Sequence, residues 1–110
     1  MEELIIYQKT YDMLKYGYIC LREFPKSEKY ALANDIKIIM DQLLHLIIQA
    51  NKRYYKKNTL QNMDIELASL KTYIRLAKDL EFLSFKKYEN WIKMLDEIGK
   101  MIGGWIKSIN

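Results

Sequence analysis

The residues with the clearest chemical meaning form a short basic and aromatic run, NKRYYKKN, at positions 51–58. Four of its eight residues carry a positive charge, and two are tyrosines. Basic side chains neutralise phosphates and aromatic rings stack on unpaired bases, so this composition is typical of a surface that binds RNA or DNA. The predicted binding residues in this run are Lys52, Arg53, Lys56 and Lys57. A solvated basic loop without a ligand is the alternative interpretation.

A second basic pair, Lys71 and Arg75, falls within a segment that is predicted to be helical. Residues four apart lie side by side on one helix face, so both cations can contact the same nucleic-acid backbone. Tyr73 lies between them in the sequence and could stack on a base. The chain holds no motif that reads base edges, so we expect recognition of the backbone without sequence specificity.

The chain offers little that could support catalysis or bind a metal. His45 and Cys20 are the only residues of their kinds, and both lie in apolar stretches, LLHLI and YICL. This setting favours a core or interface position for the histidine and a core position for the cysteine. Five acidic residues of the second half are scattered and show no converging pair: Glu66, Asp79, Glu81, Asp96 and Glu97. We therefore predict a protein that is not an enzyme and binds neither metal nor cofactor.

The composition indicates one all-α domain over residues 1–110. Half of the residues are hydrophobic, but the chain holds only one proline and four glycines. So few turn-forming residues favour long helices over the many short strands of a β-fold. The net charge of +4 is uneven, because residues 26–57 carry seven basic and three acidic side chains. This local excess favours an anionic partner.

Three features predict a cytoplasmic protein without a membrane partner. The single cysteine allows no internal disulfide, which agrees with a reducing compartment. No apolar run reaches the roughly 18 residues that a membrane span needs. The N-terminus, MEELIIYQKT, begins with acids where a signal peptide has bases.

Four segments show the three-four spacing of apolar residues that is typical of helices. The expected helices span residues 2–23, 27–54, 60–80 and 85–109. Their expected N-caps, from the second helix on, are Ser27, Asn58 or Thr59, and Ser84. Four helices of this length with short links predict an antiparallel, up-down-up-down four-helix bundle.

Each expected helix has a line of predicted core residues. In chain order these lines are Leu4, Tyr7, Tyr11, Leu14, Tyr18 and Leu21; Leu32, Ile36, Ile39, Leu43, Leu46 or Ile47, and Ala50; Leu60, Met63, Leu67, Leu70, Ile74 and Ala77; and Phe85, Tyr88, Ile92, Leu95, Ile98, Ile102 and Ile106. Trp91 and Trp105 are expected beside the fourth line, and Gly17 is a weak point in the first helix.

The second helix is apolar around most of its circumference, so the core of one chain cannot cover all of it. The residues outside its core line are Ile38, Met40, Leu44 and Ile48. Of these, Ile38, Leu44 and Ile48 are predicted to form an oligomer interface with another copy of the chain. Gly99 and Gly103 share one face of the fourth helix, which favours close packing against another helix. A frayed C-terminal end is the alternative.

Three stretches resemble the accessory variability determinant (Avd) proteins of diversity-generating retroelements. They are IIYQKTYDMLKYGY near the N-terminus, FPKSEKYALANDIKIIMDQLLHLIIQANK in the middle and GKMIGGWIKSIN at the end. FPKSEKYAL is shared with a wider four-helix-bundle group, which includes proteins encoded in intervening sequences of bacterial 23S ribosomal RNA genes. The YQKTYD start and the ending with Gly99, Gly103, Trp105 and Ile106 are more specific to Avd.

The resemblance implies a homopentameric barrel of four-helix bundles with a basic surface. It also implies two partners, nucleic acid and the reverse transcriptase of the retroelement, with which the protein supports mutagenic copying of a template RNA. The basic pair of the family corresponds to Lys71 and Arg75. Five chains that each carry +4 would carry about +20, a strong field for RNA or DNA.

Two hypotheses on function stay open at this point. The first is the nucleic-acid-binding accessory protein of a reverse transcriptase that the resemblance implies. The second is a structural or protein-interaction bundle of the intervening-sequence type, with no direct nucleic-acid role. A reverse transcriptase gene beside this one would favour the first hypothesis, and a surrounding ribosomal RNA gene would favour the second.

Overall fold

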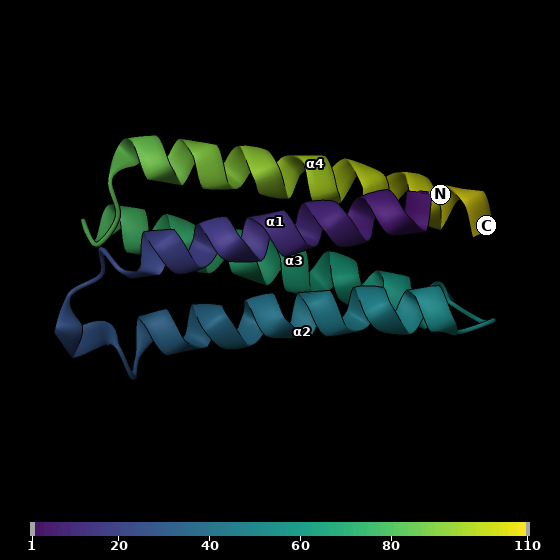
Figure 1. Cartoon of the computed structure of the whole chain (residues 1–110), viewed down its shortest axis with the longest axis horizontal. Helices are drawn as coiled ribbons and strands as arrows, with labels where there is room; N and C mark the ends of the chain where they lie inside the picture. Colours follow the sequence, from purple (N-terminus) through teal and green to yellow (C-terminus); the bar gives the residue numbers. More distant parts are fainter. Residues whose placement is uncertain (1, 110) are drawn as a thin grey trace.

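Four α-helices and one short 3-10 helix make up the computed structural model, which describes residues 2–109 and the side chains of residues 4–109. The elements are α1 (Glu2–Leu21), η1 (Lys26–Glu28), α2 (Leu32–Lys52), α3 (Lys57–Asp79) and α4 (Phe85–Ile109). Successive helices run in opposite directions, and both α1 and α3 pack against α2 and α4 (Figure 1). The predicted antiparallel four-helix bundle is therefore confirmed for one chain.

The two ends of the bundle differ in what they hold (Figure 1). The end that we call the η1 end holds the α1–α2 connection with η1 and the α3–α4 connection. The other end, which we call the tip, holds the α2–α3 connection, the start of α1 and the last turn of α4. The bundle measures 42 × 24 × 19 Å. Within the described residues, none of the helices is both long enough and apolar enough to cross a membrane.

The predicted core lines of α2 and α3 are confirmed. All six predicted residues of α3 are buried. On α2, Ile47 takes the buried position for which Leu46 was the alternative, and Leu46 packs at the edge of the core. Met40 was expected outside the core but is fully buried, because its side chain occupies the space left by Gly17 of α1.

The predicted core line of α1 is wrong for most of its residues. Leu4, Tyr7, Tyr11 and Tyr18 are exposed. Of the predicted line only Leu14 and Leu21 are buried. The other buried residues of this segment are Ile6, Thr10, Met13, Gly17, Cys20 and Phe24. Three residues of this second set are small or polar, so its hydrophobic pattern is weak, and the large tyrosines dominated the prediction.

Both tryptophans of α4 lie in the core, whereas they were predicted to lie beside it. Trp91 is fully buried and Trp105 is nearly so, while Phe85, the first residue of the predicted line, is exposed. The indole N–H of Trp91 donates to Met13 Sδ of α1 at 3.4 Å. Indole rings are large enough to fill the space between α1 and α4, so they replace smaller residues of the predicted line.

The absence of a side chain at Gly17 of α1 leaves room for side chains of two other helices. A β-carbon at this position would lie 2.5 Å from Met40 Sδ of α2 and 2.9 Å from Trp91 Cζ2 of α4. At Gly99 the nearest atom to a β-carbon would be Leu67 Cδ2 at 3.1 Å, and Gly103 has no described atom within 4 Å. The predicted close packing is therefore found at Gly99 but, within one chain, not at Gly103. Among the four glycines the tightest contact is at Gly17, for which only a weakening of the helix was predicted.

The start of α2 also differs from the prediction. Ser27 lies in η1 and does not cap a helix, and α2 begins at Leu32. The polar segment after Pro25 has no apolar line to hold it on the core, so it turns through hydrogen bonds between residues three apart. Glu28 satisfies the first N–H group of α2, because its Oε1 accepts a hydrogen bond from Leu32 N–H at 3.3 Å.

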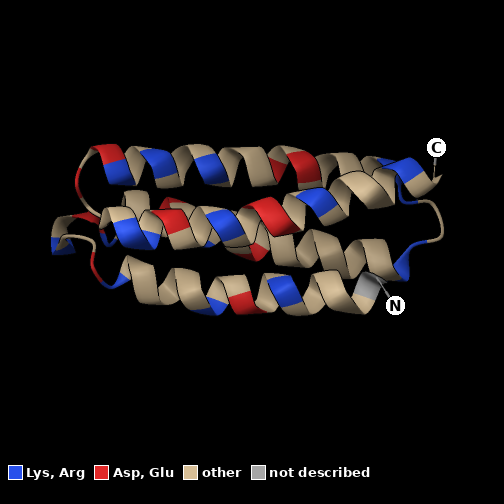
Figure 2. Ribbon diagram, turned by 90° about the horizontal axis from the view of Figure 1, so that it is seen from above, with Lys and Arg blue, Asp and Glu red and all other residues tan. Residues whose placement is uncertain are grey.

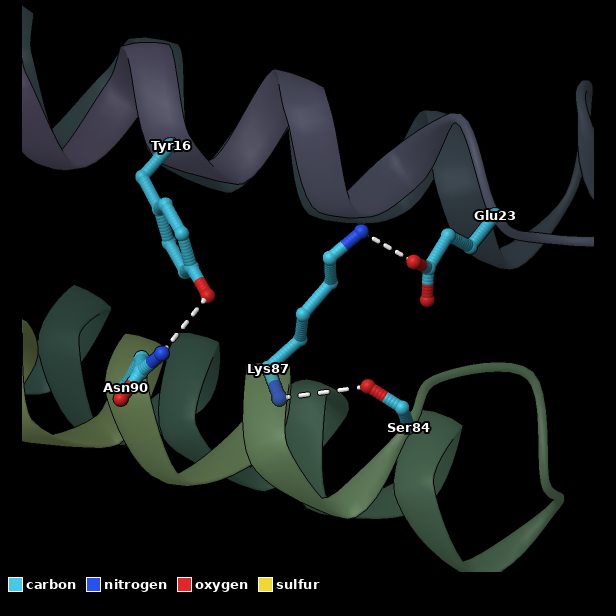
Figure 3. Close-up of polar contacts among 5 residues, drawn as sticks. All are labelled: Tyr16, Glu23, Ser84, Lys87 and Asn90. Atoms are coloured by element: carbon cyan, nitrogen blue, oxygen red, sulfur yellow. Dashed lines mark hydrogen bonds and ion pairs between the residues drawn. The ribbon is translucent and has the colours of Figure 1, made fainter.

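Polar contacts join α1 to α4 near the η1 end (Figure 3). Ser84 caps α4 as predicted, because its Oγ accepts a hydrogen bond from Lys87 N–H at 3.2 Å. The Lys87 ammonium pairs with the Glu23 carboxylate, and this hydrogen bond raises the Lys87 pKa. Asn90 Nδ2 donates to Tyr16 Oη at 3.3 Å.

We expect Gly17→Ala to lower the free energy of unfolding by about 1–3 kcal/mol. The added methyl group would push against the rigid Trp91 ring in a close-packed core. Gly103→Ala is the matched control, and it should be neutral or stabilise by up to about 1 kcal/mol, because alanine favours a helix more than glycine does. Urea unfolding measures both values. Equal stabilities of the two variants would contradict the Gly17 contact.

Candidate nucleic-acid interface

The candidate site begins where α2 loses its contacts with the core. Ala50 is the last buried residue of α2, and the helix ends at Lys52 because Arg53 has an extended backbone, with φ −91° and ψ 144°. The helix therefore ends two residues earlier than predicted. Tyr54 and Tyr55 follow with 88% and 86% exposure, and their rings meet edge to face at 4.9 Å. Rings exposed in this way are available to stack on bases.

Lys56 has a structural role that the sequence did not reveal. Its Nζ donates a hydrogen bond to the carbonyl oxygen of Ala50 and lies 5.7 Å from the centroid of the Trp105 ring. The lysine thus satisfies a carbonyl group that the end of α2 leaves without a helical partner. It also places a cation over an aromatic face, a favourable contact. Lys56 therefore ties the α2–α3 connection to both α2 and α4.

The contacts of Lys56 also determine the residue at which α3 begins. The Lys56 contacts hold the connection in a short turn, and α3 begins at Lys57, three residues earlier than predicted. Asn58 and Thr59 consequently lie inside the helix and do not cap it, and Thr59 is buried. The N-cap residue is Lys56, which makes no side-chain capping bond.

The other three predicted cations of the tip point away from the core. Lys52, Arg53 and Lys57 are exposed, and none of them pairs with a described carboxylate. Lys107 lies in the last turn of α4 and so belongs to the same end of the bundle, where Lys and Arg segments gather (Figure 2). The sequence analysis missed Lys107, although the predicted up-down topology could have placed it there.

Lys71 and Arg75 form a second basic group on the outer face of α3, one turn apart as predicted. Each has a carboxylate nearby: Lys71 Nζ is 2.7 Å from Asp96 of α4, and Arg75 Nε is 3.8 Å from Asp79. Exposed ion pairs contribute only about 0–1 kcal/mol, so a phosphate can replace either carboxylate. The helical rise between Lys57 and Lys71 separates this group from the tip by about 21 Å. The structure therefore keeps the predicted binding residues in two groups.

The predicted oligomer interface on α2 is only partly covered within one chain. Ile38 and Ile48 are 46% and 38% exposed, and Leu44 packs against the edge of the core. His45 is exposed near them, with its Nε2 3.1 Å from Gln49 Nε2. A core position for His45 is therefore wrong, and an interface position stays a prediction. The cause is the helical period, which places the core line of α2 on the opposite side.

The exposed face of α1 adds an aromatic surface beside α2. Tyr7 and Tyr11 stack with their ring centroids 6.5 Å apart, and Lys37 Nζ of α2 lies 5.7 Å from the Tyr18 ring. Partial burial and the nearby Asp41 carboxylate raise the pKa of Tyr18. Exposed aromatic side chains that gather on one surface are typical of a protein contact.

The remaining reactive side chains of the described residues lie apart from the two basic groups. Between residues 4 and 109, no group of His, Cys, Asp and Glu side chains could hold a metal ion. Cys20 is a core residue as predicted, and its burial raises the pKa of its thiol to about 11, which leaves it unreactive. Glu97 pairs with Lys9 at 2.7 Å, and this hydrogen bond lowers the Glu97 pKa.

Together these features define a class, a helical bundle protein with two basic surface groups and an exposed aromatic and apolar face. Comparison with protein families identifies the class more narrowly. The family described as bAvd-like matches residues 4–109, nearly the whole chain. The chain therefore belongs to the bAvd-like family, and this confirms the resemblance to Avd proteins. The family is of an accessory, non-catalytic type. No curated protein matches the chain.

We expect Lys56→Ala to lower the free energy of unfolding by about 1 kcal/mol. The variant loses the hydrogen bond to Ala50 and the contact with the Trp105 ring. The neighbouring Lys57→Ala removes the same charge from an exposed position and should change stability by less than about 0.5 kcal/mol. Urea unfolding of the two variants makes the comparison. If Lys56→Ala were as stable as Lys57→Ala, Lys56 would not hold the tip in place.

Proposed function

We propose that this protein is a non-catalytic accessory protein of a diversity-generating retroelement. In this role it binds RNA or DNA and a reverse transcriptase in the cytoplasm, and it supports mutagenic retrohoming. Membership of the bAvd-like family supports the accessory role. The observation that carries the nucleic-acid part is the tip, where three exposed cations without described carboxylate partners lie beside two exposed tyrosines.

The tip suits the backbone of a single strand. Lys52, Arg53 and Lys57 can neutralise phosphates without first giving up a described ion pair, and each phosphate contact releases condensed counterions. Tyr54 and Tyr55 offer faces for stacking, which is tolerant of sequence because every base has a π-face. Backbone contacts and stacking together give binding without reading base edges.

The α3 group provides a second, weaker contact in this proposal. A phosphate at Lys71 or Arg75 must compete with Asp96 or Asp79, whereas a phosphate at the tip has no such competitor among the described residues. Lys56 adds its charge to the tip although its Nζ stays bonded to Ala50. All six predicted residues thus contribute, with the exposed cations of the tip contributing most.

Assembly would strengthen this charge. The exposed part of the Ile38, Leu44 and Ile48 surface, together with Tyr7 and Tyr11 of α1, supports a homo-oligomer, for which we propose a pentameric barrel. Cyclic symmetry places the same end of every chain on the same side of a ring. Five tips would then form one basic ring, with a field that attracts RNA or DNA from a distance.

We expect wild-type protein to bind unrelated RNA and DNA sequences with similar affinity, and the affinity to fall steeply as salt rises. Replacing Lys52, Arg53 and Lys57 by Ala should reduce the slope of log affinity against log salt by about 2–3, since each phosphate contact contributes roughly 0.7–0.9. Filter-binding titrations at several salt concentrations measure the slope.

Two further variants complete this experiment. Lys71→Ala with Arg75→Ala should flatten the slope less, while Lys86→Ala with Lys93→Ala removes two exposed charges of α4 and serves as the control. A slope that is the same in the tip variant and the control variant would remove the tip from the binding site. Binding that does not depend on salt would contradict the backbone contacts altogether.

Light scattering should find a closed assembly, with five chains of 13.3 kDa as the expected mass. Ile38→Glu with Ile48→Glu should dissociate the assembly into folded monomers, because both side chains are partly exposed in one chain and would place charge in the interface. Ile65→Glu is the matched control on α3, where the side chain is 61% exposed. A wild-type monomer at micromolar concentration would overturn the assembly.

A protein-interaction bundle without a nucleic-acid role is the second candidate. The observation that favours it is the exposed aromatic face of α1, which contributes nothing to phosphate binding. The two candidates differ in one measurement, since only the first binds RNA or DNA at low salt. Wild-type protein that binds neither would leave the interaction bundle as the conclusion.

A further inference from the structure

A pocket of about 320 Å³ lies at the η1 end, between the end of α1, η1 and the start of α2. The 21 residues of α2 separate it from the tip by about 30 Å. Its size is at the lower limit of small-molecule sites. Part of its lining, Phe24-Pro25-Lys26, comes from the FPKSEKYAL stretch. Phe24 and Glu28 of that stretch serve the packing and the start of α2, but nothing so far assigns a role to Lys26 and Lys29.

The pocket concentrates positive charge. Its basic lining residues are Arg22, Lys26, Lys29 and Lys37. None of the four forms an ion pair with a described carboxylate. Four cations around so small a space repel one another, and an anion in the pocket would relieve that repulsion.

Four carboxylates lie close to the pocket lining in the sequence: Glu23, Glu28, Asp35 and Asp41. None of them forms an ion pair with the four cations of the lining. Glu23 pairs with Lys87 on the side of α1 that faces α4 (Figure 3), and Glu28 accepts the N–H of Leu32. The Asp41 carboxylate, together with partial burial, raises the Tyr18 pKa, but Asp41 lies one turn beyond the lining of the pocket. The carboxylates around the pocket therefore leave its four cations available to a ligand.

The rest of the lining is apolar and partly aromatic. Tyr18, Leu21 and Pro25 supply this wall, and the Tyr18 ring is exposed. Lys37 Nζ lies 5.7 Å from the centroid of that ring, so aromatic and cationic groups lie side by side. Such a pocket suits a ligand that is anionic at one end and flat and apolar at the other.

We propose that the η1 pocket binds a nucleotide, with its phosphate on Arg22, Lys26 and Lys29 and its base against Tyr18 and Pro25. A guanidinium group holds a phosphate through two parallel hydrogen bonds, and lysines add point charges. A terminal phosphate carries about −1.5 to −2 at neutral pH, which matches concentrated cations. An acidic peptide carries one charge per carboxylate and needs a longer groove, so it fits less well. The site is separate from the tip and does not depend on it.

The test is a calorimetric titration of the full chain with adenosine 5′-monophosphate, inorganic phosphate and adenosine. We expect one nucleotide per chain, bound at least tenfold more tightly than phosphate or adenosine alone, because the pocket holds both parts. Lys26→Ala with Lys29→Ala should weaken nucleotide binding about tenfold. Tyr18→Ala should weaken binding of the nucleotide while it leaves binding of inorganic phosphate within about twofold.

Two controls separate the pocket from general charge and from the tip. Lys86→Ala with Lys93→Ala removes the same charge from α4 and should leave nucleotide affinity within about twofold. The tip variant of Lys52, Arg53 and Lys57 should also leave nucleotide affinity within about twofold. A failure of the proposed tip site can therefore be distinguished from a failure of the proposed pocket. Thermal unfolding of each variant checks that the bundle stays folded.

The proposal is overturned if the Lys26 and Lys29 variant binds the nucleotide like wild type, or if the nucleotide binds no more tightly than phosphate. Stronger competition by a hexaglutamate peptide than by the nucleotide would also overturn it, in favour of an acidic partner. Oligoadenylates of ten nucleotides then distinguish two possible ligands, the end of a nucleic-acid strand and a free nucleotide. Tighter binding with a 5′-phosphate than with a 5′-hydroxyl indicates a strand end, and no gain over the mononucleotide indicates a free nucleotide.

Discussion

The close packing of α1, α2 and α4 at Gly17 is the constraint on which the rest of the bundle depends. The backbone of α1 lies against Met40 Sδ and the Trp91 ring at a distance that no β-carbon would allow. Because Trp91 is fully buried, it fixes the register of the three helices relative to one another. That register turns Tyr7 and Tyr11 outward, and it therefore decides which surface of α1 is available to a partner.

The net charge of the chain hides an uneven distribution of paired and unpaired charges along the bundle. Ion pairs between neighbouring helices lie along its length, as between Lys9 and Glu97 and between Lys71 and Asp96. At the tip and around the η1 pocket, cations have no carboxylate partner among the described residues. A chain of modest total charge thus presents two separate positive regions, and local fields of this kind determine where anions gather.

At the tip, the exposed binding groups belong to a connection that is held in place. Lys56 joins the connection to Ala50 and Trp105, so the exposed residues on either side project from a short turn rather than from a long loop. A surface that is already held in place loses less conformational entropy when it binds. One lysine of the basic run therefore orders the tip, while its neighbours are free to contact phosphates.

The sequence by itself determined the four α-helices, the core faces of α2 and α3, the basic run and the family, because helical period, charge and motifs are local properties. The tertiary structure alone decided the buried face of α1, where Thr10, Gly17 and Cys20 form a face that looks weak in isolation. It also decided the internal role of Lys56, whose ammonium group lies over the Trp105 ring. Each of these depends on the side chain that lies opposite on another helix, such as Trp91 or Trp105, and only the packed bundle brings those side chains together.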